Sequence, residues 1–239
     1  MNHDGVLLFS GGLDSLCLGI LLRRDGLDLI PVYVHHRANG GGITSKEVKA
    51  ATKLAPLVTG HELAHVRKRP RGTPKQVVGD PDTRTFWTTK VPLTTKVKKN
   101  RRNEELIRAL VDCGLGHGVV ALGALGHDEE ARWVDLSGYP FQRDIEHYHL
   151  QGKFPRGPEL ITPQSMGLGK ADLIASVGPW HADEMFASDS CLMYFKRHCG
   201  NCKSCKSRAQ AFLVALGEDR TNYRRDSWAD RLRKANRKR

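Results

Sequence analysis

A glycine turn close to the start of the chain could bind phosphate. Residues 10–15 read Ser-Gly-Gly-Leu-Asp-Ser and separate an apolar run at 6–9 from a helical pattern that begins at Leu13. Backbone N–H groups at a helix N-terminus attract anions, and glycine lets the backbone approach phosphate oxygens closely. The two serines add hydroxyl donors, while Asp14 could hold Mg²⁺ or brace the loop. The turn therefore predicts a pyrophosphate site, with an ordinary glycine-rich turn as the alternative.

A group of cysteines near the other end of the chain could bind a metal. Four of the six cysteines fall within 15 residues, at Cys191, Cys199, Cys202 and Cys205. Four thiolates close a tetrahedral Zn²⁺ site, which is the structural rather than the catalytic type. We see no secretion signal and so do not expect disulfides. The spacing favours zinc, and free or redox-active thiols and an iron–sulfur cluster are the alternatives.

The positive charge of the chain is concentrated in two segments. The net charge is +12, yet residues 67–102 hold 12 Lys and Arg against two Asp, and residues 219–239 hold nine against three Asp. Such segments either keep a protein soluble or bind an anionic partner. We expect the first to be a long loop, whose Lys98, Lys99, Arg101 and Arg102 would screen the charge of a bound nucleotide. We expect the second to be a disordered tail, although the spacing of Trp228 and Leu232 also allows a short helix.

The elements that must position these residues follow from the apolar periodicity. Short apolar runs alternate with helical patterns, which is typical of an α/β fold with a parallel sheet and helices on both faces. A nucleotide-binding domain is expected at 1–185, a zinc-binding helical subdomain at 186–218, and the tail at 219–239. No apolar run is long enough to span a membrane, so we expect a cytoplasmic protein. The expected strands are 6–9, 29–34, 85–87 and 119–122, and the expected helices begin at Leu13, Ser45 (as N-cap), Asn103, Lys170 and Cys205.

The glycine turn resembles a known nucleotide-binding loop. It fits neither the Walker A pattern nor the dinucleotide fingerprint, but it is similar to the PP-loop of the ATP pyrophosphatases. These enzymes cleave ATP between the α and β phosphates to adenylate a substrate. The resemblance implies the fold of that superfamily, a Rossmann-like doubly wound sheet of the adenine nucleotide alpha-hydrolase type, with a small C-terminal zinc-binding helical subdomain.

The two motifs together resemble the 7-cyano-7-deazaguanine synthase family. The C-terminal part of the resemblance runs from Ser190-Cys191 to Cys199-Gly200-Asn201-Cys202 and on to Arg208. Smaller matches are Arg102-Asn103, Ser137-Gly138-Tyr139-Pro140, Ile161-Thr162-Pro163 and Leu168-Gly169-Lys170-Ala171.

The resemblance implies an activity and a set of site residues. In that family ATP adenylates the carboxylate of 7-carboxy-7-deazaguanine, ammonia forms the amide, and a second ATP activates the amide for dehydration to the nitrile. It implies ATP, Mg²⁺ and Zn²⁺ as cofactors, a homodimer, and no requirement for nucleic acid. The catalytic residues would be Asp14, Ser15, Lys170 and either Asp128 or Asp135. The zinc ligands would be Cys191, Cys199, Cys202 and Cys205. The residues that bind the nucleotide would be Phe9, Ser10, Gly11, Gly12, Leu13, Asp14, Ser15, Leu16, Cys17, Leu18, Gly19 and Arg102.

Departures from the family pattern keep other functions open. Phe141 stands where the family has Asp, and His35-His36-Arg37-Ala38 replaces an Asp-Tyr-Gly-Gln element, so the substrate or the final product could differ. One alternative is a related amidating enzyme. Another is a tRNA-modifying PP-loop enzyme, which the basic segments would suit, although Cys17 and Cys113 read as core and leave no evident catalytic thiol. A third is a nucleic-acid-binding module without activity.

Overall fold

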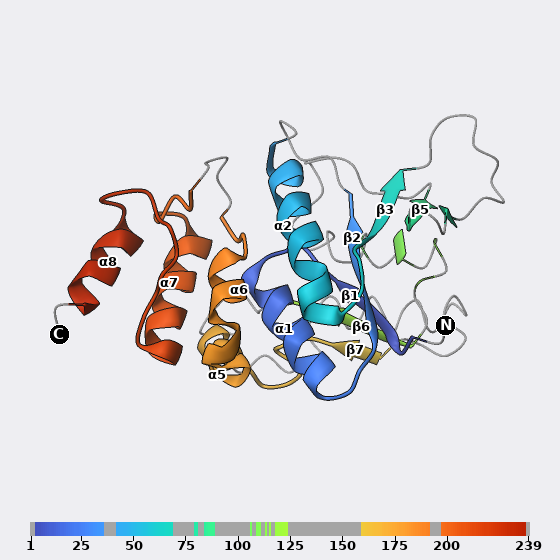
Figure 1. The fold of residues 1–239 in the computed structure, drawn as a ribbon, viewed down its shortest axis with the longest axis horizontal. Helices are drawn as coiled ribbons and strands as arrows, with labels where there is room; N and C mark the ends of the chain where they lie inside the picture. Colours follow the sequence, from blue (N-terminus) through green and yellow to red (C-terminus); the bar gives the residue numbers. More distant parts are fainter. Residues whose placement is uncertain are drawn as a thin grey trace.

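The computed structural model describes most of the chain, apart from the two residues at each end and several internal segments. The described residues are 3–35, 42–68, 79–80, 84–88, 106, 109–110, 113, 115, 118–123, 159–191 and 197–237. They form a sheet with a row of helices that extends from it toward the C-terminus (Figure 1).

The sheet is parallel except at one edge. The described strands are β1 (Gly5–Leu8), β2 (Leu29–Val34), β3 (Ala64–Lys68), β4 (Gly79–Asp80), β5 (Thr85–Thr88), β6 (Val119–Leu122) and β7 (Glu159–Ile161), in the order β4-β5-β3-β2-β1-β6-β7. Only the β4–β5 pair is antiparallel among them. Because β2 and β6 flank β1 on opposite sides, the chain reverses its direction of winding at β1. In open α/β sheets, this point is where ligands bind, outside the carboxyl ends of the strands.

Two apolar clusters cover the two faces of the sheet. Leu7 and Phe9 belong to the cluster shared with α1 (Leu13–Arg24), α2 (Gly42–Thr59) and α5 (Lys170–Val177). Val6 and Leu8 point to the opposite cluster, which includes Leu110 and other residues of the segment after the basic loop. This alternation along β1 is what a sheet buried on both faces requires. The expected doubly wound α/β fold is therefore confirmed.

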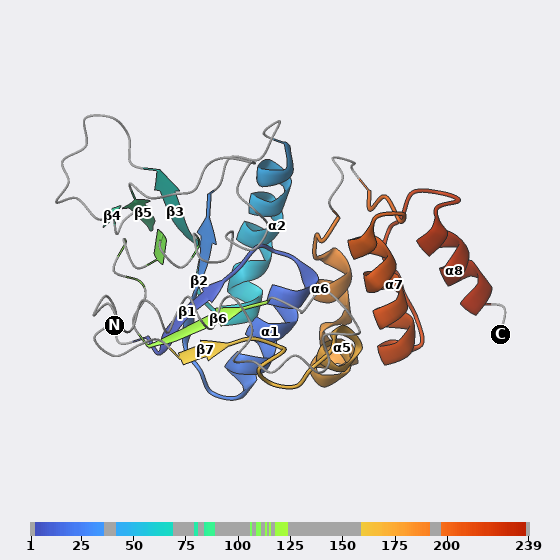
Figure 2. The same ribbon diagram turned by 180° about the vertical axis from the view of Figure 1, so that it is seen from behind.

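The C-terminal helices continue the row. After α5 come a 3₁₀ turn (Pro179–His181), α6 (Ala182–Ala187), α7 (Lys203–Leu216) and α8 (Trp228–Asn236). Helix α7 packs against α5, and α8 packs against α7, so the order in space is α2, α1, α5, α7, α8 (Figures 1 and 2). The domain boundary that we expected at residue 186 falls inside α6.

Several sequence expectations need correction. Helix α2 begins at Gly42, so Ser45 is not its N-cap, and α7 begins at Lys203 rather than Cys205. Strand β3 was not predicted, because Ala64–Lys68 alternates small, polar and apolar residues and lacks a continuous apolar run. Most of residues 67–102 lies outside the described part, as does most of the helix expected from Asn103. Among the described residues, no helix is both long and apolar enough to cross a membrane.

The expectation of a disordered tail is wrong for residues 219–237. Ser227 accepts a hydrogen bond from the backbone N–H of Asp230 and caps α8. Tyr223 and Ala229 are buried, and they join the apolar cluster formed by the cysteines. Arg233 and Lys234 both pair with the Asp230 carboxylate. Some of the charges that we expected to be solvated therefore form ion pairs within α8.

Candidate functional site

The glycine loop lies at the carboxyl end of β1, where the winding of the sheet reverses. The strand ends at Leu8, and α1 begins at Leu13 with Gly12 as its N-cap. The first N–H groups of an α-helix have no partner within the helix, and the positive end of the helix dipole lies beside them. The loop therefore presents backbone donors at the point where the winding of the sheet reverses.

Internal hydrogen bonds shape this loop. The Ser10 hydroxyl accepts from the backbone N–H of Gly12 at 3.3 Å and lies 3.3 Å from the Ser15 hydroxyl, which donates to the Gly12 carbonyl at 3.1 Å. Gly11 has a φ of 71°, and a Cβ there would lie 2.5 Å from the backbone nitrogen of Ala51 in α2. Only glycine fits this position without moving α2. Two hydroxyl groups are thereby held beside the N-terminus of α1.

A second glycine brings the other half of the sheet against the glycine loop. Gly123 follows β6, and a Cβ on it would lie 2.4 Å from the backbone nitrogen of Ser15 and 2.7 Å from the carbonyl carbon of Asp14. The main chain after β6 therefore passes directly against the first turn of α1. Sequence reasoning used this glycine only as a loop boundary, because nothing in the sequence indicates so close an approach.

Lys170 and Asp14 form an ion pair between the first turns of α5 and α1. The Lys170 Nζ lies 2.9 Å from Oδ1 and 3.0 Å from Oδ2 of Asp14, and their side chains are 17% and 24% exposed. Lys170 is the first residue of α5, and Asp14 is the second residue of α1. The structure thus brings together two predicted site residues from distant parts of the chain, at the rim of the glycine loop.

Other residues assigned to the nucleotide have side chains in the core. Phe9, Leu13, Leu16, Cys17 and Leu18 are buried, and Gly19 lies against Leu7 and Val58. Burial, followed by the nearby Asp14 carboxylate, raises the pKa of the Cys17 thiol well above its usual range. Cys17 is therefore a core residue rather than a nucleophile. Contact of these residues with a nucleotide stays a prediction, and the packing leaves only their backbone for it.

Asp189 connects the glycine loop to the cysteine cluster, a role that the sequence did not reveal. Its backbone N–H donates to the Gly11 carbonyl at 2.9 Å. Its carboxylate, only 10% exposed, accepts from Lys46 of α2 at 2.7 Å and from the backbone N–H of Cys191 at 3.1 Å. One residue thus bonds to the glycine loop, to α2 and to the first expected zinc ligand.

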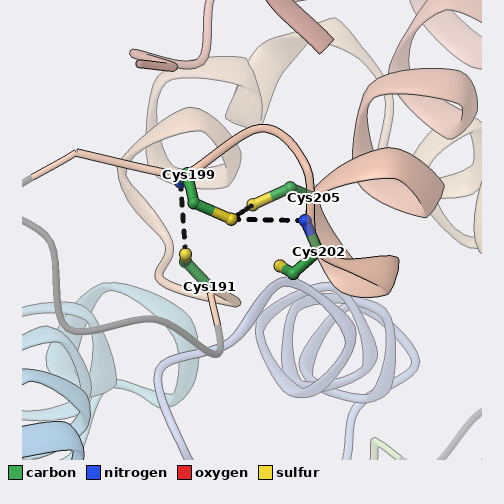
Figure 3. Close-up of side chains that lie close together, drawn as sticks. All are labelled: Cys191, Cys199, Cys202 and Cys205. Carbon is green, nitrogen blue, oxygen red and sulfur yellow. Dashed lines mark hydrogen bonds between the residues drawn. The ribbon is translucent and has the colours of Figure 1, made fainter. Parts of the chain in front are cut away.

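The cysteine cluster has the dimensions of a zinc site. One sulfur from each of the four cysteines lies within 4.8 Å of the others, and the four sulfurs face a common space (Figure 3). Sulfurs around a tetrahedral zinc with bonds of about 2.3 Å lie about 3.8 Å apart, and the Cys199 and Cys205 sulfurs are 3.8 Å apart. The backbone N–H groups of Cys199 and Cys202 donate to the sulfurs of Cys191 and Cys199, each at 3.3 Å. This donor set fits Zn²⁺.

Burial and mutual contact suppress ionisation of the cluster thiols. The neighbouring Cys191 thiol, followed by burial, raises the pKa of the Cys205 thiol, and burial raises that of Cys199. Thiols so crowded stay protonated unless a cation stabilises their thiolates. A bound Zn²⁺ would supply that charge.

A buried arginine holds the segment that leads to the cysteine cluster. Arg208 of α7 is fully buried, and burial lowers its pKa. Its guanidinium donates to the hydroxyls of Thr221, Ser188 and Ser190 and to the carbonyls of Met185 and Phe186. A buried charge needs such bonds to be tolerated. The arginine of the family motif thus fixes the segment that leads from α6 to Cys191.

Two histidines from neighbouring parts of the sheet lie close together. His35 directly follows β2, and its Nε2 lies 3.0 Å from Nδ1 of His65 in β3. Burial lowers the pKa of His65. Tyr33 donates to Glu47 of α2 at 2.9 Å. The sequence singled out His35 but not His65, because β3 was not foreseen.

Several residues of the predicted site lie outside the described part of the chain, so their roles stay predictions. They are His36, Arg102, Asp128, Asp135, residues 137–140 and Phe141.

Comparison with known proteins agrees with the resemblance of the motifs. No model of a known protein family matches the chain. A 7-cyano-7-deazaguanine synthase of Methanothrix thermoacetophila is 24% identical over 240 residues, which cover 91% of this chain and 97% of that protein. The similarity therefore extends beyond the glycine loop and the cysteines, and nearly the whole chain is similar to a 7-cyano-7-deazaguanine synthase.

Proposed function

We propose that this protein uses ATP to convert 7-carboxy-7-deazaguanine and ammonia to 7-cyano-7-deazaguanine. The observation that carries the proposal is the position of the Ser-Gly-Gly-Leu-Asp-Ser loop. It lies where the chain reverses its direction of winding through the sheet, and Lys170 is paired to Asp14 beside it. The similarity to a 7-cyano-7-deazaguanine synthase along 91% of the chain supports the choice of substrate.

The proposed reaction has two activation steps. The substrate carboxylate attacks the α-phosphorus of ATP, pyrophosphate leaves, and ammonia then displaces AMP from the acyl adenylate to give the amide and a proton. The amide oxygen attacks a second ATP and again releases pyrophosphate. Loss of AMP and of the remaining N–H protons gives the nitrile. Each activation converts an oxygen that is a poor leaving group into part of AMP, which is a good leaving group.

The described residues suit the role of holding pyrophosphate. The N–H groups at the start of α1 and the Ser10 and Ser15 hydroxyls would bind its oxygens. Lys170 would give up its ion pair with Asp14 and pair with a phosphate instead. Asp14 would then be free to hold Mg²⁺, which takes carboxylate and phosphate oxygens and neutralises developing charge. Positioning two reactants in this way can itself supply much of the rate enhancement.

Product analysis tests the proposal. Purified protein is incubated with ATP, Mg²⁺, ammonium and 7-carboxy-7-deazaguanine, and products are followed by mass spectrometry while pyrophosphate and AMP are counted. We expect the nitrile, with the amide as an intermediate and two AMP for each nitrile formed. The amide as the final product, with one AMP, would instead identify a related amidating enzyme. No product in the presence of all four reactants would overturn the proposal.

The ordered C-terminal segment favours a second candidate, an enzyme that adenylates a base in RNA. Arg225, Arg231 and Lys234 are exposed on or beside α8, next to the cysteine cluster. Basic surfaces of this kind bind nucleic acid in a strongly salt-dependent way. Against sulfur transfer to a base, Cys17 and Cys113 are both buried. Pyrophosphate release that requires tRNA and not the free deazaguanine acid would select this candidate.

A further inference from the structure

A second group of metal-binding side chains lies at the opposite end of the sheet. His3 precedes β1, Asp28 precedes β2, and His61 precedes β3. Since β1, β2 and β3 are neighbours and run parallel, their amino ends meet at one edge. The glycine loop follows the carboxyl end of β1, so the two sites are separated by the length of the strands. Neither the proposed reaction nor the cysteine cluster uses these three residues.

The three side chains converge on one another. His3 Nδ1 lies 2.8 Å from one Asp28 oxygen, and His61 Nε2 lies 2.5 Å from the other. One ligand atom of each residue lies within 4.8 Å of the other two, and the His3 and His61 rings meet edge to face at 5.0 Å. Ligand atoms around a tetrahedral zinc with bonds of about 2.05 Å lie about 3.3 Å apart. Small side-chain rotations would reach that spacing, because all three side chains are partly exposed.

Local hydrogen bonds hold Asp28 and His61 in place. The Asp28 N–H donates to the Asp4 carboxylate at 2.7 Å, and the Asp4 N–H donates to the Asp28 carbonyl at 2.9 Å. The His61 N–H donates to the Thr59 hydroxyl, which itself donates to the carbonyl of Ala55 in α2. The loop before β2 and the turn after α2 are thereby fixed, so that little ordering is left for a ligand to impose.

The chemistry of the group selects a class of metal. Two imidazole nitrogens and one carboxylate oxygen suit zinc and its neighbours in the first transition row, whereas Mg²⁺ and Ca²⁺ prefer oxygen alone. We propose that His3, Asp28 and His61 form a second Zn²⁺ site, with its remaining coordination position open to water. This site goes beyond the proposed function and would stand or fall independently of it.

Metal counting tests the proposal. Untagged protein is dialysed against buffered Zn²⁺ at about pH 7.5, where imidazole ligands are deprotonated, and zinc per chain is measured. We expect His61→Gln and Asp28→Asn each to lose about one equivalent relative to the wild type, as their ligand atoms are removed. His181→Gln is the matched control, because His181 lies in the turn after α5 and outside the cluster. It should keep the full zinc content.

Cobalt distinguishes the two sites. Co²⁺ bound to the cysteines gives a thiolate-to-metal charge-transfer band, whereas Co²⁺ bound to nitrogen and oxygen does not. We expect His61→Gln to keep that band and to lose only the weaker ligand-field absorption of the second site. Circular dichroism in the same zinc-containing buffer should match the wild type, which rules out misfolding as the cause. Equal zinc content in His61→Gln and wild type would overturn the proposal.

Discussion

The Lys170 ammonium lies 2.9 Å from one carboxylate oxygen of Asp14 and 3.0 Å from the other, although 156 positions separate the two residues. The pair joins the N-terminal ends of α5 and α1. A helix dipole disfavours a cation at this end, so Lys170 depends on a nearby anion. In the structure that anion is Asp14. A bound phosphate would compete with Asp14 for Lys170, and the first two predictions follow from this competition.

Replacing Asp14 should stop catalysis without unfolding the protein. We expect Asp14→Ala to lower pyrophosphate release by at least about 100-fold, the usual cost of losing an electrostatic contact in the transition state. The free energy of unfolding should fall by about 1 kcal/mol or less, because ion pairs in contact with solvent contribute little. Steady-state kinetics and thermal melting measure the two effects. Asp25→Ala, at the exposed end of α1, should leave both unchanged; normal turnover in Asp14→Ala would contradict the site.

The two members of the pair should act together in catalysis and not in stability. We expect Lys170→Ala to raise KM for ATP. We expect Asp14→Ala/Lys170→Ala to be hardly slower than the worse single variant, because both residues would position the same pyrophosphate, Lys170 directly and Asp14 through Mg²⁺. In unfolding experiments the coupling energy should stay below about 1 kcal/mol. A double-mutant cycle measures both. Additive losses of activity would show that the residues act separately.

Removal of one cluster thiol should cost metal and stability together. We expect Cys202→Ser to lose one zinc equivalent and to unfold with about 3 kcal/mol less free energy, because metal binding contributes directly to folding. For a chain of this size, such a loss lowers the melting temperature by about 6–12 °C. Cys113→Ser is the control: Cys113 is buried outside the cluster, so its replacement should destabilise the fold and keep the zinc. Unchanged zinc in Cys202→Ser would contradict the assignment.

The carboxylate of Asp189 should support both sites. We expect Asp189→Ala to reduce zinc retention and to lower the free energy of unfolding by about 1–3 kcal/mol, because it leaves the Cys191 N–H and Lys46 without their partner. ATP turnover should fall less, because the backbone bond to Gly11 remains and only the connection to α2 is lost. Asp189→Asn can still accept from Cys191 and should retain more zinc. The exposed Asp183 provides a control. Wild-type zinc content and kinetics in Asp189→Ala would refute the connection.

The C-terminal segment should be needed for folding. From the sequence alone we expected that deleting residues 221–239 would leave small-molecule turnover within about threefold, or under about 1 kcal/mol in barrier. The structure reverses this expectation, because the deletion removes the buried Thr221, Tyr223 and Ala229, and Thr221 accepts one of the hydrogen bonds of Arg208. We now expect loss of soluble protein or a fall of more than about 3 kcal/mol in unfolding free energy. Truncation after residue 237 is the control, and unchanged melting of the longer deletion would exclude this role.

Local patterns were enough to predict the elements around the glycine loop. Strands β1, β2 and β6 are continuous apolar runs, and α1 and α5 follow glycine turns with clear helical periodicity. Strand β3 was missed because His65 and Arg67 interrupt its apolar side chains. The tail was misjudged because its charges were taken as solvated, whereas some of them pair within α8.

Contacts between distant segments could not be predicted in the same way. The Asp14–Lys170 pair and the Asp189 bonds depend on how helices are placed across the sheet, and the resemblance supplied only the identity of some members. The approach of Gly123 to Ser15 and the meeting of His3 with His61 depend on strand order. Strand order follows from the packing of the whole sheet, which no local pattern records.

The central place of β1 in the sheet determines when the glycine loop can be completed during synthesis. Strand β1 pairs on one side with β2, which follows it closely, and on the other with β6, which begins only at Val119. At about 5–20 residues per second, some 85 residues separate the synthesis of β2 from that of β6 by about 4–17 s. One edge of β1 stays open throughout that interval, and Lys170 and Asp189 are made later still. The loop that is translated first is therefore assembled last, and a ribosome-bound chain should bind ATP only after residue 189 has left the exit tunnel.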